Sequence, residues 1–246
     1  MPELERVTVT VEQKLLSSID LLVEQRKAKS RSHAFDILLR KALAGNELRK
    51  AVLLAGGPPE VILEPRSKQP KPLVDISGIT VVERTITHLK RHGVEEIVVV
   101  LGYQGEKIVS RLQDGTQFGV KISYIWENTS SLGSAGALKL AQSQMDEPFL
   151  LSYSDVLYDS LDLGDLYRFH KSAGGACTLA LADAGETASF GVAVLSGSKV
   201  IDFTEKPTGA SRAQSHLVNA GVAICEPEVF SFIPKNSKMS FEKELL

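Results

Sequence analysis

The chain has 246 residues, a formal net charge of −2 at pH 7, 43% hydrophobic residues and 24% charged residues. These are the proportions of an ordinary globular protein, and no apolar run reaches the roughly 18 residues that a membrane-spanning helix needs. The first residues, MPELERVTVTV, lack the basic region and apolar core of a signal peptide. We therefore expect a cytoplasmic protein without a membrane partner, whose cysteines, Cys177 and Cys225, stay reduced.

The charge distribution separates the chain into two parts. Residues 1–50 carry ten Lys or Arg against seven Asp or Glu, whereas the remaining residues carry eighteen against twenty-three. A basic segment ahead of an acidic body indicates two modules with different partners. We place the boundary at the Gly45-Asn46-Glu47 junction, which gives a small domain over residues 1–46 and a larger one over residues 49–246.

The first module begins with a strand pattern. Polar and β-branched residues alternate strictly from Arg6 to Val11, which predicts one half-buried strand. An apolar stripe at helical spacing over residues 15–23 predicts a helix, and Ser30 is placed to cap a second one. A lone strand leaves its backbone N–H and C=O groups without partners, so we expect two copies to pair as an antiparallel ribbon.

The strand–helix–helix order, with SRSHAF opening the second helix, resembles the ribbon-helix-helix family of DNA-binding proteins over about residues 5–44. The resemblance implies a homodimer through residues 1–46, whose ribbon reads bases in the major groove while the start of the second helix holds a phosphate. The base readers would be Arg6, Thr8 and Thr10, and the phosphate binders Ser30, Arg31 and Ser32. The alternative is a ribbon that only dimerises the protein.

Strand and helix patterns alternate in residues 49–246. Strands are predicted at 51–54, 96–101, 121–126 and 148–153, and helices at 80–92, 104–112 and 134–144. This order predicts an α/β fold of right-handed βαβ units around a sheet covered on both faces. Ligands of such sheets bind outside the carboxyl ends of the strands, so the loops after Leu54, Trp126 and Tyr153 form the candidate site.

These loops carry motifs similar to those of the sugar-1-phosphate nucleotidylyltransferases. LAGG at residues 54–57 and PKPL at residues 70–73 match the two ends of that family's first signature. Further matches follow in the family's order: LGSAG (132–136), the strand FLLSYSD ending at Asp155, FGV (190–192), EKP (205–207) and VNAG (218–221). The resemblance implies a Rossmann-like nucleotide-diphospho-sugar transferase fold of the GT-A type, preceded by the β-α-α ribbon-helix-helix module.

The resemblance also implies roles for individual residues. The family joins a sugar 1-phosphate to a nucleoside triphosphate, and cations offset the repulsion between the two anions. Asp155 would hold Mg²⁺ and act with Lys71, which would contact a phosphate. Lys206 could do likewise, while Glu205 and Asn219 would hydrogen-bond sugar hydroxyls. The base would be contacted by backbone near Leu54, Ala55 and Gly56 and by variable residues around Glu127. Gly133 would leave room for the nucleotide and sugar, and Gly191 for the sugar ring.

Several substitutions affect the part of this site that would bind the triphosphate. Where the family has G, T and R, the chain has Pro59, Glu60 and Val61. Pro58 and Pro59 have no backbone N–H and fix φ at about −65°, so an anion-binding turn loses two donors. Val61 removes the arginine that would grip phosphates, and the carboxylates of Glu60 and Glu64 add repulsion.

Two further features bear on catalysis. Arg66 and Lys68 lie in the same loop and could reach the phosphates if the loop refolds. In the family, a second metal-binding aspartate follows the segment matched by Phe241-Glu242-Lys243, beyond Leu246, where the present sequence ends. We therefore expect an impaired triphosphate half beside a preserved sugar half.

Three hypotheses about function follow. The first is a dimeric transcriptional regulator, in which the ribbon-helix-helix head binds DNA and the body binds a sugar nucleotide or sugar phosphate. The second is an active nucleotidyltransferase that makes a nucleotide sugar with Mg²⁺, its head serving only dimerisation. The third is a scaffold that binds neither DNA nor nucleotide.

Overall fold

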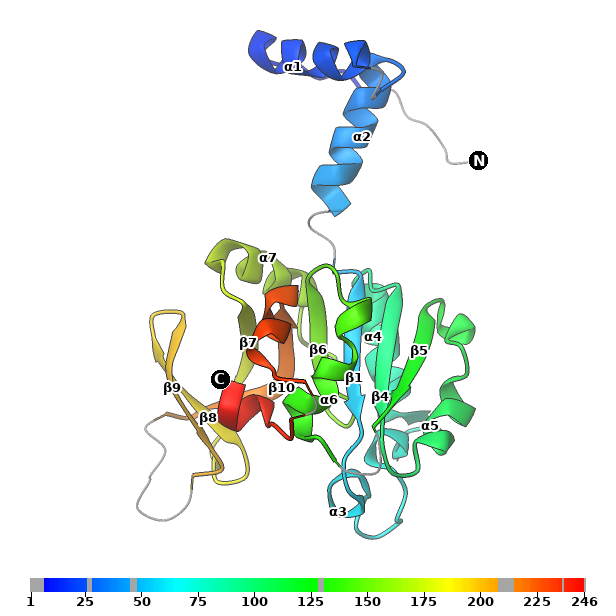
Figure 1. The fold of residues 1–246 in the computed structure, drawn as a ribbon, viewed down its shortest axis with the longest axis vertical. Helices are drawn as coiled ribbons and strands as arrows, with labels where there is room; N and C mark the ends of the chain where they lie inside the picture. Colours follow the sequence, from blue (N-terminus) through cyan, green and yellow to red (C-terminus); the bar gives the residue numbers. More distant parts are fainter. Residues whose placement is uncertain are drawn as a thin grey trace. The chain divides into compact units, whose positions relative to one another are not determined.

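Figure 1 shows the fold in the computed structural model, which describes residues 7–25, 28–44, 48–127, 131–207, 215–235 and 237–245. The chain forms two compact units, Met1–Asn46 and Glu47–Leu246, and each is described by itself. Among the described residues, every helix is too short or too polar to cross a membrane.

The N-terminal unit contains the two predicted helices, α1 (Gln13–Glu24) and α2 (Arg31–Ala44). Ser30 caps the second helix, because its Oγ accepts the backbone N–H of His33 at 3.2 Å. The helix therefore begins where the sequence predicted.

The hydrophobic core of this unit is small. Its buried side chains are Ile19, Ala28 and Ala34. In contrast, Leu15 is 57% exposed and Val7 is 74% exposed, although both belong to apolar patterns of the sequence. In the described part of this unit the buried cluster is small for an independent domain, and a partner that covers the exposed apolar side chains stays a prediction.

The strand expected over residues 6–11 is absent from the single chain. Residues 7–12 have no helical or strand structure, and Arg6 lies outside the described residues. The physical reason is that an edge without a neighbour cannot satisfy its backbone groups, and the described part of this unit supplies no second strand. The ribbon stays a prediction about two copies of the chain.

The larger unit is built on one eight-stranded sheet. The strand order is β5-β4-β1-β6-β10-β8-β9, and β7 also pairs with β10. The first four strands in this order, β5, β4, β1 and β6, are parallel to one another. Strand β10 runs antiparallel to β6, β7 and β8. The parallel strands are β1 (Lys50–Ala55), β4 (Glu96–Leu101), β5 (Lys121–Trp126) and β6 (Phe149–Tyr153). The antiparallel strands are β7 (Cys177–Asp183), β8 (Gly191–Ser196), β9 (Lys199–Glu205) and β10 (Leu217–Cys225).

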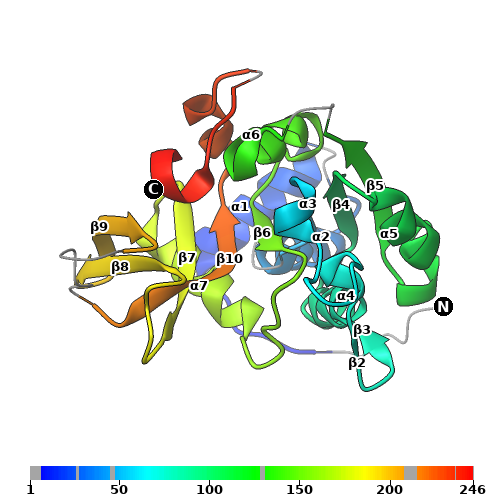
Figure 2. The ribbon, with the colours of Figure 1, turned by 90° about the horizontal axis from the view of Figure 1, so that it is seen from below.

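Helices cover both faces of this sheet, as Figure 2 shows for α4 and α6. One face carries α4 (Val81–Arg91), α5 (Gly105–Leu112) and α7 (Leu163–Ala173), and the other carries α6 (Gly133–Leu140). The remaining short elements are α3 (Pro59–Ile62), η1 (Lys71–Leu73), β2 (Asp75–Ile76), β3 (Ile79–Thr80), η2 (Thr116–Phe118), η3 (Gln142–Gln144), η4 (Pro227–Phe232) and η5 (Phe241–Leu245). The α/β fold with a parallel core is thus confirmed, including the four predicted strands.

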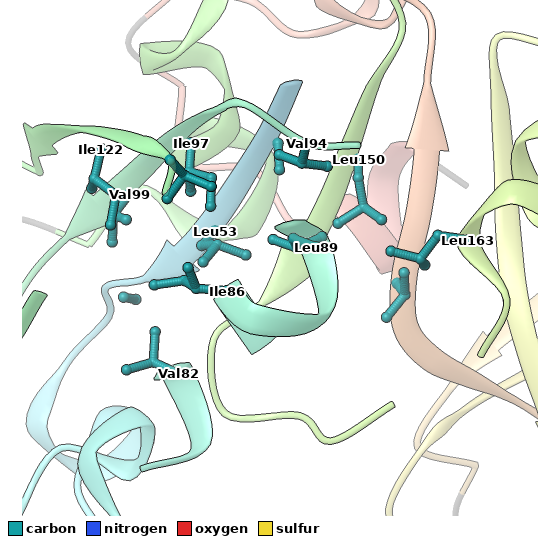
Figure 3. Close-up of a cluster of buried hydrophobic side chains, with 14 of the residues drawn as sticks. Leu53, Val82, Ile86, Leu89, Val94, Ile97, Val99, Ile122, Leu150 and Leu163 are labelled. Carbon is teal, nitrogen blue, oxygen red and sulfur yellow. The ribbon is translucent and has the colours of Figure 1, made fainter. Parts of the chain in front are cut away.

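Side chains of β1 alternate between two separate core clusters. Ala51 and Leu53 belong to the cluster under α4, which Figure 3 shows, and Val52 and Leu54 belong to the cluster under α6. A strand that is covered on both faces must be apolar at every position, which explains the continuous run AVLLA.

The two cysteines lie opposite each other on β7 and β10. Their Sγ atoms are 3.6 Å apart, and both thiols are free. Cys225 is buried and Cys177 is half-buried. The contact with Cys177, together with burial, raises the pKa of the Cys225 thiol, which makes this thiol a poor nucleophile at neutral pH.

We predict that Leu53→Ala lowers the free energy of unfolding of the larger unit by about 2–5 kcal/mol, because it leaves a cavity in a fully buried layer. Leu157→Ala is the matched control, since that side chain is 48% exposed and should cost less than about 1 kcal/mol. Urea unfolding followed by circular dichroism measures both. Equal losses for the two variants would contradict this account of the core.

Candidate active site

The loops after β1 and β6 leave the sheet side by side. The two strands pair in parallel, with Leu54 opposite Tyr153. The backbone N–H and the Oγ of buried Ser154 both donate to the carbonyl oxygen of Leu54, at 3.1 and 2.8 Å. The loops after β1 and β6, which were predicted to form the site, therefore lie together at the carboxyl ends of neighbouring parallel strands.

The two residues predicted to be catalytic lie together at this edge. Lys71 Nζ is 3.8 Å from Asp155 Oδ2, and about a third of each side chain is exposed (37% and 31%). Lys71 belongs to η1 and Asp155 follows β6, so the sheet edge brings together residues 84 positions apart. The two charges attract each other at this distance. Because both side chains are partly exposed, a phosphate of a ligand could bind beside the ammonium group of Lys71.

The glycine turn after β1 is held by a carboxylate of the protein itself. Gly57 donates its backbone N–H to Glu127 Oε2 at 2.9 Å, and Leu132 donates its own to Glu127 Oε1 at 3.1 Å. Glu127 follows the edge strand β5, so it links the turn after β1 to the loop before α6. Sequence reasoning placed Glu127 among variable residues near the base and predicted no contact for it within the protein, because a single glutamate after a strand carries no pattern.

The substituted segment after this turn forms a short helix. Pro58 is its N-cap residue and Pro59 its first residue in α3, a position where proline is favoured. The N–H of Val61 donates to the carbonyl oxygen of Pro58 at 2.9 Å, and the Val61 side chain is 54% exposed. Donors that could cradle phosphate are therefore either absent, in the prolines, or used within the protein, in Gly57 and Val61.

The loop between α3 and η1 engages Glu64 in its own turn. Glu64 accepts hydrogen bonds from the backbone N–H groups of Arg66 and Ser67, which hold the pKa of its carboxyl below the usual value. Leu63 and Pro70 close this loop through an isolated bridge. These hydrogen bonds favour the charged form of Glu64, so the expected repulsion of a triphosphate by Glu60 and Glu64 stays a prediction.

A hollow of about 310 Å³ lies over these loops. Its lining comes from the turns after β1, β4 and β5: Gly57, Pro58, Pro59, Gly102, Tyr103, Glu127 and Ser131. Of the residues expected at the base, Gly56 lies directly beneath Glu127, while Leu54 and Ala55 are buried in β1. The hollow is large enough for part of a nucleotide, and its floor is the Glu127 carboxylate.

Gly133 lies against the C-terminal segment. A Cβ atom on Gly133 would come within 2.5 Å of the Met239 carbonyl oxygen, and the N–H of Ala135 donates to the same oxygen at 3.0 Å. The small residues of LGSAG were expected to let the backbone approach a ligand. In the structure, they let the backbone of Met239 approach the helix. The sequence predicted a close approach at Gly133 but did not identify Met239 as the neighbour.

The segments expected to bind the sugar meet on the antiparallel side of the sheet. Gly191 pairs with Glu205 across β8 and β9, and a Cβ atom on Gly191 would lie 2.3 Å from Phe203 Cζ. The Phe203 ring and the Glu205 carboxylate lie against Gly191, and the room that Gly191 was expected to leave for a sugar ring stays a prediction. Lys206 is 65% exposed, with its Nζ 3.8 Å from Glu205 Oε1.

Asn219 has a side-chain contact inside the protein. Its Oδ1 accepts the backbone N–H of Gly221 at 3.0 Å, inside an irregularity of the β10 pairing. Asn219 lines a small cavity of about 10 Å³, the size of one water molecule, with Tyr153 and Glu242. Its expected hydrogen bonds to sugar hydroxyls stay a prediction.

The metal site predicted at Asp155 rests on one carboxylate. Among the residues that the structure describes, no group of three or more His, Cys, Asp or Glu side chains could hold a metal. Mg²⁺ is commonly bound by one or two carboxylates together with substrate phosphates and water. Asp155 therefore fits a metal that arrives with a phosphate ligand rather than one held by the protein alone.

The residues proposed to contact DNA are placed only in part. Thr8, Thr10, Ser30 and Ser32 are exposed, and Arg6 lies outside the described residues. Arg31 makes a bidentate ion pair with Asp20, with Nε–Oδ1 at 2.6 Å and Nη2–Oδ2 at 2.7 Å. This pair engages the guanidinium group of Arg31, whereas the phosphate contact was predicted for the backbone N–H groups at the start of the helix.

The sheet order and the loops at its carboxyl edge define an α/β protein of the Rossmann-like class. A family model described as "Nucleotidyl transferase" matches residues 50–246. The chain therefore belongs to the nucleotidyl transferase family. The match begins at β1, so the N-terminal unit lies outside it.

Individual relatives agree with this assignment. The UTP–glucose-1-phosphate uridylyltransferase of Synechocystis is 32% identical over 210 residues, which cover 80% of this chain and 54% of that protein. Mannose-1-phosphate guanylyltransferase 1 of Arabidopsis thaliana is 34% identical over 202 residues, covering 79% and 54%. The structure of HddC from Yersinia pseudotuberculosis is similar with a TM-score of 0.66 at 25% identity, covering 81% and 85% of the two chains. The chain thus spans about half the length of the curated relatives it matches.

We predict that Gly56→Ala lowers the free energy of unfolding by about 1–3 kcal/mol, because the new Cβ would lie 2.2 Å from Glu127 Oε2. The loss should be smaller in a Glu127→Ala background, where the clash is removed. Gly185→Ala is the control, since a Cβ there meets nothing within 4 Å. Urea unfolding of the double-mutant cycle measures the coupling, and strictly additive losses would show that Glu127 does not support the turn.

Proposed function

We propose that the body binds a sugar nucleotide or sugar phosphate without efficient turnover, and that the head converts this binding into regulated DNA binding. The observation that carries this proposal is the contrast between the two halves of the site. Lys71 and Asp155 form an ion pair that is partly exposed. In the turn after β1, by contrast, the backbone N–H of Gly57 donates to the Glu127 carboxylate, and the chain continues into α3. The relatives' names support a sugar phosphate and a nucleotide as ligand classes.

The physical argument concerns where negative charge can be stabilised. A triphosphate needs several N–H donors or cations around its oxygens, and loss of a single stabilising donor typically costs a hundredfold or more in rate. Here the Glu127 carboxylate already accepts the N–H of Gly57. A second anion at this position would meet that carboxylate as well as two prolines without N–H groups. Weak catalysis is the expected consequence.

The opposite side of the site still offers binding groups. Lys71 and the exposed Lys206 supply positive charge for a phosphate, and Asp155 would hold Mg²⁺ that bridges to it. When bound, Mg²⁺ neutralises charge on phosphate oxygens. Within the chain, Lys71 orients the phosphate and Glu205 accepts hydrogen bonds from sugar hydroxyls.

The N-terminal unit would supply dimerisation and DNA contact. Its exposed Val7 and Val9 (74% and 62%) match the core-facing positions of a ribbon, where a second copy would cover them. Thr8 and Thr10 alternate with these valines and would face the DNA. A coupling of about 1–3 kcal/mol between the two units would suffice for regulation.

The second candidate is an active nucleotidyltransferase whose head only dimerises it. It is favoured by the retained Lys71–Asp155 pair and by relatives that are named as transferases. Both candidates bind the same ligand classes, so turnover and DNA binding separate them.

We predict that UDP-glucose or GDP-mannose binds the full chain, and that no triphosphate and sugar 1-phosphate pair yields pyrophosphate above background. Asp155→Asn should weaken ligand binding in the presence of Mg²⁺ by about tenfold, because the metal loses its carboxylate ligand. Asp165→Asn, at a side chain that is 78% exposed and outside the site, is the control. Calorimetry and a pyrophosphate-release assay measure the two outcomes. Release that requires Mg²⁺ and disappears only in Asp155→Asn would establish the second candidate.

We predict that the full chain binds DNA from upstream of its own gene as a dimer, with affinity that falls as salt rises. Thr8→Ala should lower this affinity by about 1–3 kcal/mol, since one base contact is lost. Thr87→Ala, on α4 of the body, is the control and should bind normally. Fluorescence anisotropy with and without UDP-glucose measures both affinity and coupling. Absence of salt-dependent binding in every condition would refute the regulatory part of the proposal.

A further inference from the structure

Cys177 and Cys225 lie at the two ends of a long segment of the body. Cys177 is the first residue of β7, and Cys225, 48 positions later, is the last residue of β10. Between them lie β8, β9 and the four residues predicted to contact the sugar or a phosphate beside it: Gly191, Glu205, Lys206 and Asn219. A covalent bond between the two thiols would therefore close a loop around this whole segment.

The backbone at this pair has the geometry that a cross-strand disulfide needs. Cys225 lies directly opposite Cys177 in the antiparallel pairing of β10 with β7. The neighbouring pair is hydrogen-bonded, since the N–H of Glu226 donates to the carbonyl oxygen of Ala176 at 2.9 Å. Because hydrogen-bonded and non-hydrogen-bonded pairs alternate, the cysteines form a non-hydrogen-bonded pair, in which the Cα atoms typically lie about 4.5 Å apart. Disulfides bridge Cα separations of about 4.4–6.8 Å, so the bond requires no rearrangement of the strands.

The two sulfur atoms are in contact and differ in their access to solvent. They are 3.6 Å apart, and a movement of about 1.5 Å would bring them to the length of a disulfide bond. Cys225 is fully buried in the core cluster under α6, whereas Cys177 is half-buried. Residues 171–175, at the end of α7 and just before Cys177, are exposed. A small oxidant from solvent would therefore reach Cys177 first.

We propose that Cys177 and Cys225 are a peroxide-sensitive thiol pair that forms a reversible disulfide between β7 and β10. The sulfur of Cys177 attacks one oxygen of hydrogen peroxide and the O–O bond breaks, which gives a sulfenic acid at Cys177 and one water molecule that carries the thiol proton. The sulfur of Cys225 then attacks the sulfur of Cys177, and the hydroxyl group leaves as a second water with the proton of the Cys225 thiol. Two thiols are thereby oxidised to a disulfide, and one peroxide is reduced to two waters.

The contact between the sulfur atoms favours the second step. Cys225 does not need to meet an oxidant from solvent, because its reaction partner is the adjacent sulfur of Cys177. Closing the bond should therefore be faster than further oxidation of the sulfenic acid. The disulfide restricts the unfolded chain over the segment that carries β8 and β9, so it should stabilise the folded body. The inference holds for any ligand of the body, since no step involves one.

The test begins with full-length wild-type protein and a slight excess of hydrogen peroxide. We expect the intact mass to fall by two hydrogen atoms, and a non-reducing digest to contain a peptide that joins Cys177 to Cys225. The melting temperature should rise by on the order of 5–10 °C. Dithiothreitol should reverse all three changes.

Three variants test the order of the steps and the geometry. Cys225→Ala should gain one oxygen atom as a sulfenic acid at Cys177, which dimedone traps, whereas Cys177→Ala should leave the buried Cys225 unmodified. The matched control combines Cys177→Ala with Thr178→Cys, which moves the thiol by one residue to the other face of β7, where no cross-link is expected. Free thiols in treated wild-type protein, sulfinic acid at Cys177 without a cross-link, or a cross-link in the control variant would each overturn the inference.

Discussion

The parallel pairing of β1 with β6 is the constraint on which the site depends. Leu54 lies opposite Tyr153, and Ser154 donates twice to the Leu54 carbonyl oxygen, so both strands end at one level. This alignment places the loop that carries Lys71 beside the loop that carries Asp155. A shift of one residue would move each side chain of β1 from its own core layer into the opposite one, so the packing of the two layers maintains this register.

Two independent changes support the proposal that the triphosphate side of the site is impaired. Prolines remove N–H groups from the turn and favour the start of α3, and Glu127 takes the N–H of Gly57 for the protein's own structure. The second change is chemically distinct from the first, because a carboxylate occupies an acceptor position that a phosphate oxygen could take. The half of the site that is proposed to bind the sugar also contains carboxylates. These carboxylates can accept hydrogen bonds from the hydroxyl groups of a sugar.

Sequence reasoning was most accurate where a pattern has one physical solution. The apolar run of β1 and the amphipathic pattern of α4 led to elements within one residue or two of those observed. Small residues were less informative. Gly133 and Gly191 indicate that another group comes close to the backbone, but the sequence does not identify that group. In the structure, Met239 and Phe203 lie against these two glycines. The contacts of Glu127 and Glu242 within the protein were missed for another reason: a lone carboxylate has no spacing that distinguishes it from a solvated one.

By itself, the sequence determined the α/β order, the parallel strands, the family resemblance and the substitution of the phosphate turn, since these depend on local periodicity and on neighbours along the chain. The tertiary structure decided which partners the polar groups have. Arg31 pairs with Asp20, Glu127 holds Gly57, and Glu242 holds Tyr153. Two of these contacts join residues 70 or more positions apart, and such partners are chosen by packing, because a buried carboxylate must find donors wherever the folded chain provides them.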